Sequence, residues 1–363
     1  YNQDFHKWKK DPNKMNVADY QSRAFYKYKR DLFRFAADIE GTIWKDIKWN
    51  AGVGVLGYMI DECDINMLNG KNEFDPNISL GEQKAMNKDI EGVYEKYIKW
   101  GLIDQAEARG GWHPYLRAGL TYDSRNMRTC PTKGIYADAF FTYTAAFNAA
   151  YGQQATEGYN HLQFNFNFRH YVSLYQDRVI FAYRLGLQNN LAGKSPFYMN
   201  SYLNTIFIQR VMYEGLGGAN SLRGIMRNRI LANGFAYANV ELRTKVAKFD
   251  IGRQQFYIGL APFFDLGVIT QPYKLNEATI KAKHADDMKN NPKYTLPLEK
   301  YFDLDENGNI DQSEIYMPHM AAGLGLKIAM NENFVFSVDW AMALDKRDNA
   351  KWANFYIKMG YLF

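Results

Sequence analysis

A twelve-residue segment in the last quarter of the chain has the residue types and spacing of a divalent-cation site. Carboxylate or amide side chains occupy its positions 1, 3, 5, 7, 9 and 12, and Gly308 occupies position 6, where such a loop turns sharply. This pattern matches the template of a calcium-binding loop, which surrounds the ion with oxygen atoms. We therefore predict a structural Ca²⁺ site, against the alternative of a solvated acidic loop. The predicted ligands are Asp303, Asp305, Asn307, Asn309, Asp311 and Glu314.

No group of residues in the sequence indicates catalysis. The six histidines are scattered, and none forms a recognisable nucleophile motif with a serine or a cysteine. The two cysteines, Cys63 and Cys130, are too few for a disulfide scaffold and match no metal-ligand spacing. The net charge of +5 is spread along the chain, without the basic and aromatic cluster of a nucleic-acid site. The sequence therefore predicts neither an enzyme nor a nucleic-acid-binding protein.

The composition fits a β-barrel better than a bundle of membrane helices. Aromatic residues make up 16% of the chain, yet its mean hydropathy is −0.45. No apolar run reaches the roughly 18 residues of a membrane helix. The strands of a barrel show one face to lipid and the other to water, so their average hydropathy stays near neutral. No Pro/Gly/Ser-rich linker divides the 363 residues, which favours one continuous architecture.

Strict alternation of apolar and polar residues is the main structural signal. In the last segment Phe355, Ile357 and Met359 share one face, while Tyr356 and Lys358 share the other. Several segments alternate in this way over roughly eight residues or more, and strands of roughly 11–14 residues suit a tilted bilayer crossing better than the shorter strands of a soluble sandwich. We predict an all-β, transmembrane antiparallel barrel, with a large soluble β-protein as the alternative.

Counting these segments gives about twelve strands, an even number, as bacterial single-chain barrels have. The expected strands are residues 16–29, 32–45, 47–60, 113–124, 134–148, 157–173, 178–190, 233–247, 254–268, 319–330, 333–345 and 351–363.

The connections between these strands separate into long and short ones. The long connections 61–112, 191–232 and 269–318 all follow odd-numbered strands, whereas most even-numbered strands lead into short turns. Outer-membrane barrels have long loops outside and short turns in the periplasm. We therefore expect a barrel over 16–363 in a bacterial outer membrane, preceded by a periplasmic segment, 1–15. Cys63 and Cys130 would lie on opposite sides of the membrane and would not pair. No signal peptide is visible at Tyr1, so we expect an exported chain in processed form or a fragment.

The first long connection contains a helical stripe of apolar residues set among Lys and Glu. This stripe is expected to pack against neighbouring loops, and the alternatives are that it caps the barrel mouth or binds a partner. Its members are Met86, Ile90, Val93, Tyr94 and Tyr97.

Five short patterns occur in order between about residue 115 and the end of the chain. They are Tyr122-Asp123-Ser124-Arg125 at a strand end, Leu222-Arg223-Gly224-Ile225 in the second long connection, Glu241-Leu242-Arg243 in the next strand, Phe263-Phe264-Asp265-Leu266-Gly267 in the strand after it, and a last strand that ends on Phe363. Together they resemble the outer-membrane insertase and translocase superfamily, which includes BamA, TamA and the two-partner secretion transporters. Members commonly have about 16 strands, which is the alternative to our count of twelve.

The resemblance implies that the connection carrying Arg223 folds into the barrel lumen. Strand parity places Glu241 and Asp265 on the lumen face, where a guanidinium fits a carboxylate through two parallel hydrogen bonds. The small residues Gly224 and Gly267 would let the loop approach the wall closely. The alternative is that Arg223 is a solvated loop charge.

The resemblance also implies a function in the assembly, insertion or export of outer-membrane or surface proteins. The expected partners are outer-membrane lipid, client outer-membrane proteins and partner lipoproteins. No counterpart of the family's periplasmic POTRA domains precedes residue 16. A short form without these domains leaves open the alternative of a passive pore or a structural scaffold.

Overall fold

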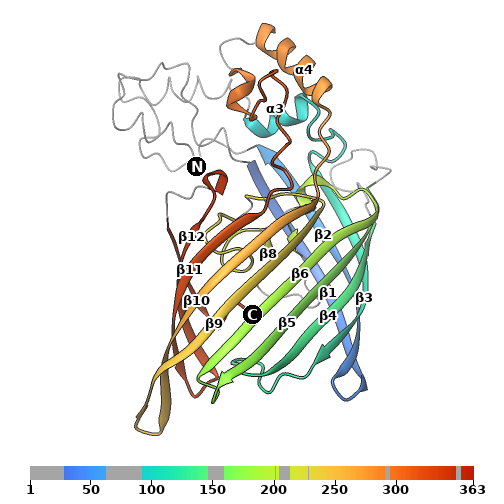
Figure 1. Ribbon diagram of the computed structural model, residues 1–363. Coiled ribbons are helices and arrows are strands. Elements are labelled where there is room, and N and C mark those ends of the chain that lie inside the picture. Colours follow the sequence, from blue (N-terminus) through green and yellow to red (C-terminus); the bar gives the residue numbers. More distant parts are fainter. Residues whose placement is uncertain are drawn as a thin grey trace, which may run out of the picture.

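Eleven antiparallel strands form one sheet in the described part of the chain, and the sheet curls into a barrel wall (Figure 1). The structure is a computed structural model that describes residues 28–62, 92–145, 159–200, 202–203, 213–227, 229–290, 295–348 and 353–363. In these ranges no helix combines the length and the apolar character needed to cross a membrane. The predicted all-β architecture is confirmed.

The strands follow one another around the wall in chain order. They are β1 (Tyr28–Trp44), β2 (Ile47–Glu62), β3 (Gly110–Asp123), β4 (Gly134–Thr144), β5 (His161–Tyr175), β6 (Val179–Gly193), β9 (Gly234–Ile251), β10 (Gln254–Gln271), β11 (His319–Met330), β12 (Phe334–Ala343) and β13 (Asn354–Met359). A separate two-stranded hairpin, β7 (Tyr202–Leu203) with β8 (Tyr213–Glu214), belongs to the connection between β6 and β9. The helices are α3 (Val93–Lys99), α4 (Glu277–Asn290), η5 (Phe197–Met199), η6 (Leu298–Lys300) and η7 (Lys346–Asp348).

Alternation sorts the side chains of the wall as the sequence predicted. In β13 the side chains of Phe355, Ile357 and Met359 point outward and are 66–71% exposed. On the inner face of the wall, charged residues such as Glu241 and Asp265 are fully buried. Consecutive residues of a strand point to opposite faces, so one strand supplies both the apolar outer surface and the polar interior.

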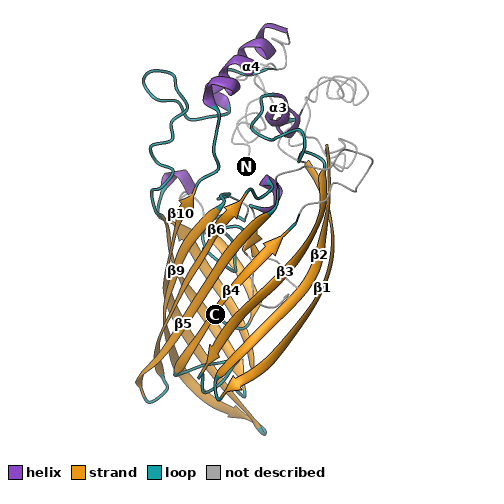
Figure 2. Ribbon diagram, turned by 90° about the vertical axis from the view of Figure 1, so that its right-hand side faces the viewer, coloured by secondary structure: helices purple, strands orange, loops and turns teal. Residues whose placement is uncertain are grey.

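Long connections gather at one end of the barrel and tight turns at the other (Figure 2). We call these the loop end and the turn end. Residues with positive φ shape three of the turns, namely Lys45 after β1, Gln176 and Asp177 after β5, and Asn331 and Glu332 after β11. These conformations match the twist of short hairpins. The predicted segregation of long and short connections is confirmed.

The two edges of the sheet differ from the prediction. β1 runs without a break from Tyr28 to Trp44, so the turn expected near residues 30–31 is absent. Most of the expected strand 16–29 lies outside the described residues. The last strand ends at Met359 rather than at Phe363. In the described ranges β1 and β13 are the two edges of the sheet, and no pairing joins them.

The connection between β6 and β9 folds into the barrel, as the resemblance implied. Leu216, Leu222 and Ile225 from this connection are fully buried and pack against Phe235 and Ala321 of the wall. We call residues 215–227 the lumen loop.

The other two long connections meet above the loop end of the barrel (Figure 1). The buried Lys96 ammonium of α3 lies 3.2 Å from a carboxylate oxygen of Asp287 in α4. Tyr94 is buried and packs against Phe197 of η5. The helical stripe thus packs against neighbouring loops, although Met86 and Ile90 lie outside the described residues.

Candidate functional site

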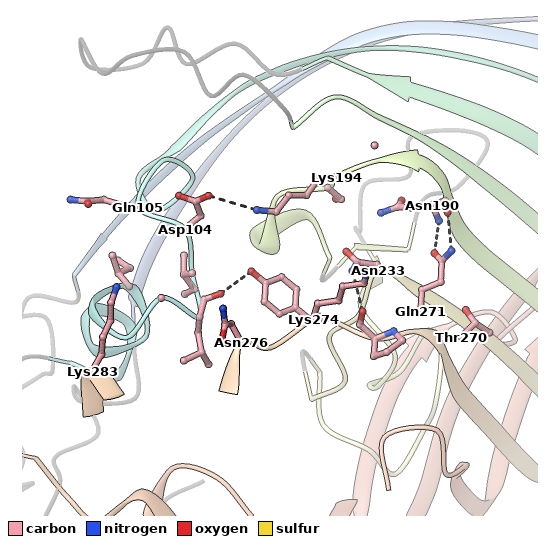
Figure 3. A pocket seen from close by; sticks show the side chains of 18 of the residues that line it. Asp104, Gln105, Asn190, Lys194, Asn233, Thr270, Gln271, Lys274, Asn276 and Lys283 are labelled. Atoms are coloured by element: carbon pink, nitrogen blue, oxygen red, sulfur yellow. Dashed lines mark hydrogen bonds and ion pairs between the residues drawn. The ribbon is translucent and has the colours of Figure 1, made fainter. Parts of the chain in front are cut away.

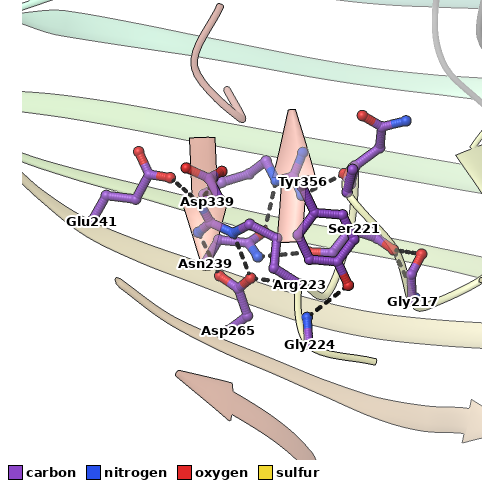
Figure 4. A network of polar contacts seen from close by, with 12 residues as sticks. Gly217, Ser221, Arg223, Gly224, Asn239, Glu241, Asp265, Asp339 and Tyr356 are labelled. Atoms are coloured by element: carbon purple, nitrogen blue, oxygen red, sulfur yellow. Dashed lines mark hydrogen bonds and ion pairs between the residues drawn. The ribbon is translucent and has the colours of Figure 1, made fainter. Parts of the chain in front are cut away.

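Arg223 forms the centre of a buried charge cluster between the lumen loop and the wall (Figure 4). Its Nε and Nη2 donate to the two oxygens of Asp265, each at 2.9 Å, and its backbone N–H donates to the same carboxylate at 3.0 Å. The guanidinium carbon lies 3.4 Å from the ring centre of Phe263. A planar guanidinium can make both contacts at once, because its edge donates while its face stacks.

Two further carboxylates complete the partners of Arg223. Its Nη1 donates to Glu241 at 2.6 Å and lies 3.3 Å from Asp339. All four charged side chains are fully buried. Since an unpaired charge in this position would carry a large desolvation penalty, the loop position that supplies Arg223 is strongly favoured.

Three more cations balance this cluster. Arg243 donates to Glu241 at 2.8 Å, Lys327 donates to Asp339, and the Lys358 ammonium lies 3.5 Å from Asp339. Four cations therefore face three carboxylates, and the strands β9, β10, β11, β12 and β13 all contribute to the cluster. The lumen loop is thereby fixed to five strands of the wall.

Gly224 joins the lumen loop to the edge strand β13. Its N–H donates to the hydroxyl of Tyr356 at 3.0 Å, and its carbonyl accepts from the side chain of Asn354 at 2.8 Å (Figure 4). Its φ of 91° is a conformation that favours glycine, and a Cβ here would lie 2.7 Å from the backbone carbon of Met342. A Cβ at Gly267 would lie 2.5 Å from Leu222. The predicted need for small residues at both positions is supported by these distances.

The last residues of the chain leave the sheet and enter the lumen. Gly360 has a φ of 91°, and beyond it Leu362 and Phe363 are buried against Tyr171. The carbonyl oxygen of Phe363 accepts a hydrogen bond of 2.7 Å from Arg243. Phe363 therefore does not close the last strand as predicted. Its ring packs against cations of the lumen instead, which is favourable because aromatic faces attract cations.

The predicted strand-end motif forms a local ion pair at the turn end, which we call the clamp. Arg125 donates through Nε and Nη2 to both oxygens of Asp123, at 2.8 and 2.9 Å, and its guanidinium lies over the ring of Tyr136. Tyr122 takes no part, because it points outward and is 40% exposed. The clamp lies apart from the Arg223 cluster. Nearby, Cys130 is a buried, free thiol, while Cys63 lies outside the described residues.

The calcium-like loop forms a compact turn between α4 and β11. Gly308 has the predicted left-handed conformation, with a φ of 74°. The carboxylate of Asp305 accepts the backbone N–H groups of Asn309 and Asn307, which lower its pKa. Glu314 faces the guanidinium of Arg347 at 3.4 Å. The described residues contain no group of three His, Cys, Asp or Glu side chains placed to hold a metal ion. Calcium binding therefore stays a prediction, and it requires Asp305 and Glu314 to exchange these partners.

Sequence reasoning found the centre of the cluster but not its full extent. It brought together Arg223, Glu241 and Asp265, which the structure places in direct contact. It missed Asp339 and Lys327. Both stand at polar positions of alternating segments, but nothing in the sequence gave their height along the barrel.

The fold and the motif order together define the family. The family model described as the Omp85 superfamily domain matches residues 66–363, and the chain belongs to this superfamily. A search of curated protein sequences found no match.

Many solved structures are similar to this chain, among them two barrel structures from bacteria. One is the structure of BamA from Haemophilus ducreyi lacking POTRA domains 1-3, with a TM-score of 0.50 and 17% identity over 92% of this chain and 55% of that one. The other is CdiB from Escherichia coli, with a TM-score of 0.50 and 11% identity over 92% of this chain and 45% of that one. At these identities the likeness concerns the fold. The chain spans about half the length of these structures.

Proposed function

We propose that this chain is a bacterial outer-membrane barrel that assists the assembly, insertion or export of outer-membrane or surface proteins, and that it is not an enzyme. The observation that carries the proposal is the direct connection between the Arg223 cluster and the edge strand β13. Gly224, next to Arg223 in the loop, makes hydrogen bonds to Tyr356 and Asn354 on that strand. Hydrogen bonds therefore tie the lumen loop to one edge of the sheet.

An unpaired strand edge can bind a further strand through backbone hydrogen bonds. In the described residues β13 has only six residues in the sheet, against 17 in β1. A short edge strand separates from its neighbours more easily than a long one. In the proposed mechanism, the lumen loop holds β13 near β1, and movement of β13 away from β1 makes its edge accessible to a client strand. The client proteins and partner lipoproteins would approach from the periplasm, at the turn end.

Depletion of the protein in its own cells tests this function. We expect the amounts of folded outer-membrane proteins to fall and to recover with the wild-type chain but not with Arg223→Ala. Arg229→Ala is the matched control, because Arg229 is an exposed arginine near the end of the same connection, and its Nη2 donates to the carbonyl of Arg347. Unchanged outer-membrane protein levels after depletion would refute an assembly role and favour the alternative of a passive pore or scaffold.

A further inference from the structure

A large cleft lies at the loop end of the barrel (Figure 3), and none of its lining residues belongs to the Arg223 cluster. Its volume is about 980 Å³, which is within the range of small-molecule sites. One wall comes from Ile98 of α3 and the residues 101–105 that follow this helix, and the other from the ends of β6 and β10 and the residues after them. Lys283 of α4 and Tyr316 complete the lining. The cleft thus lies between the helices α3 and α4 and the loop end of the barrel.

The charges that line the cleft are mostly positive. Lys194, Lys274 and Lys283 face a single carboxylate, that of Asp104. Asp104 lies 3.7 Å from Lys194 (Figure 3). The ammonium groups of Lys274 and Lys283 are exposed and make no ion pair or hydrogen bond with the described residues. Two cations are therefore available to an anionic ligand.

The base of the cleft is lined by polar side chains, and hydrogen bonds to the backbone fix their positions. Gln271 donates to the carbonyl of Asn190 at 2.8 Å and accepts the backbone N–H of the same residue at 2.8 Å. Asn233 is fixed by a 3.2 Å hydrogen bond to the carbonyl of Pro272. The ring of Tyr273 is anchored through its hydroxyl to the carbonyl of Leu102 at 2.9 Å. Fixed amides and an aromatic ring beside cations suit a sugar that carries phosphate groups.

The height of the cleft indicates where such a sugar would come from. Leu191 of β6 points outward, is 55% exposed, and precedes the lining residue Gly193 by two positions. Two residues of a strand span only about 7 Å. The apolar outer surface of the barrel therefore ends next to the cleft, at the level where lipid headgroups begin.

We propose that this cleft binds the phosphorylated sugar headgroup of an outer-leaflet glycolipid. The phosphates contact Lys274 and Lys283, and the sugar lies against Tyr273 and the fixed amides. This inference rests on the membrane orientation given under the proposed function, in which the loop end faces outward. Binding to the purified chain is independent of assembly activity in cells, so the two proposals can fail separately.

Native mass spectrometry of the detergent-solubilised full chain tests the proposal, with bisphosphorylated lipid A as the probe. We expect its affinity to exceed that of the dephosphorylated form by about tenfold or more, since charge-assisted contacts are lost with the phosphates. The double variant Lys274→Gln/Lys283→Gln is expected to lose this preference. The control variant Lys281→Gln/Lys289→Gln removes the same charge from α4 outside the cleft and is expected to retain it.

Three outcomes would overturn the inference. Equal affinity for the two lipid forms would show that phosphate is not recognised. Equal loss in both double variants would show attraction by overall charge alone. Competition by free glucosamine 6-phosphate at the same concentration as the lipid would show that a soluble sugar phosphate, not a lipid headgroup, is the ligand.

Discussion

At the scale of single residues, Arg223 makes three interactions at once that no other type of amino acid could make together in this position. It forms a two-bond contact with Asp265, donates to Glu241, and stacks on Phe263. A lysine at this position could neutralise a carboxylate. Its ammonium, however, lacks the two parallel N–H donors and the planar face of a guanidinium. The identity of the residue therefore matters more than its charge.

Arg223→Ala is expected to destabilise the folded barrel by about 3–5 kcal/mol, because it leaves buried carboxylates without their main partner. Arg223→Lys should recover only part of this loss. The measurement is the free energy of unfolding by urea for the chain folded in lipid vesicles. Arg229→Ala serves as the control and should unfold like the wild type. Equal stability of Arg223→Ala and the wild type would show that the cluster does not hold the loop.

Gly224→Ala tests the close approach of the lumen loop to β12. A methyl group here meets the Met342 backbone at 2.7 Å and also strains the positive φ. We expect a loss of about 2 kcal/mol or more in the same unfolding assay. Gly252→Ala is the matched control, since Gly252 has a positive φ but no atom within 4 Å of the added methyl. Strain alone should cost about 1 kcal/mol. Equal losses would mean that the loop does not press against the wall.

At the scale of elements, strand parity predicted which residues face the lumen but not which of them meet. Glu241 and Asp265 were paired with Arg223 through a family motif, whereas Asp339 has no motif around it. Alternation also continues through Tyr361 and Phe363, so the sequence predicted strand to the end of the chain. The structure instead bends at Gly360, because cations in the lumen offer Phe363 a better partner than a lipid-facing position would.

The calcium-like loop gives a prediction at the same scale. Calcium at millimolar concentration is expected to bind the purified chain, with Glu314 leaving Arg347 to complete the ligand shell. Isothermal titration calorimetry should detect this binding in the wild type and lose it in Glu314→Gln. Glu306→Gln removes an equal charge at a non-ligand position of the loop and should bind like the wild type. The absence of calcium-dependent heat in the wild type would leave a solvated acidic loop as the correct interpretation.

At the scale of the whole molecule, the interior of the barrel is divided. The lumen loop and the last residues of the chain fill the side lined by β6 to β13, where most of the buried charges are paired. On the side lined by β2 to β5, buried polar atoms of Asn165, Thr142 and Asn50 have no partner among the described residues. Water on that side would satisfy such groups. The described residues therefore fill the side of the interior lined by β6 to β13, which we call the filled half.

The ion conductance of single barrels in planar bilayers tests this division. We expect a small conductance in the wild type and a severalfold larger one when Gly217–Met226 is replaced by a short Gly-Ser linker, because the loop fills part of the cross-section. A second variant, Leu362→Ala/Phe363→Ala, removes bulk from the filled half without a deletion and should show an intermediate conductance. Folding of each variant is checked first by gel electrophoresis in detergent, in which an unheated, folded barrel migrates differently from the heated, unfolded chain. A large, open-channel current in the wild type, unchanged in both variants, would contradict a closed barrel and would support the passive pore.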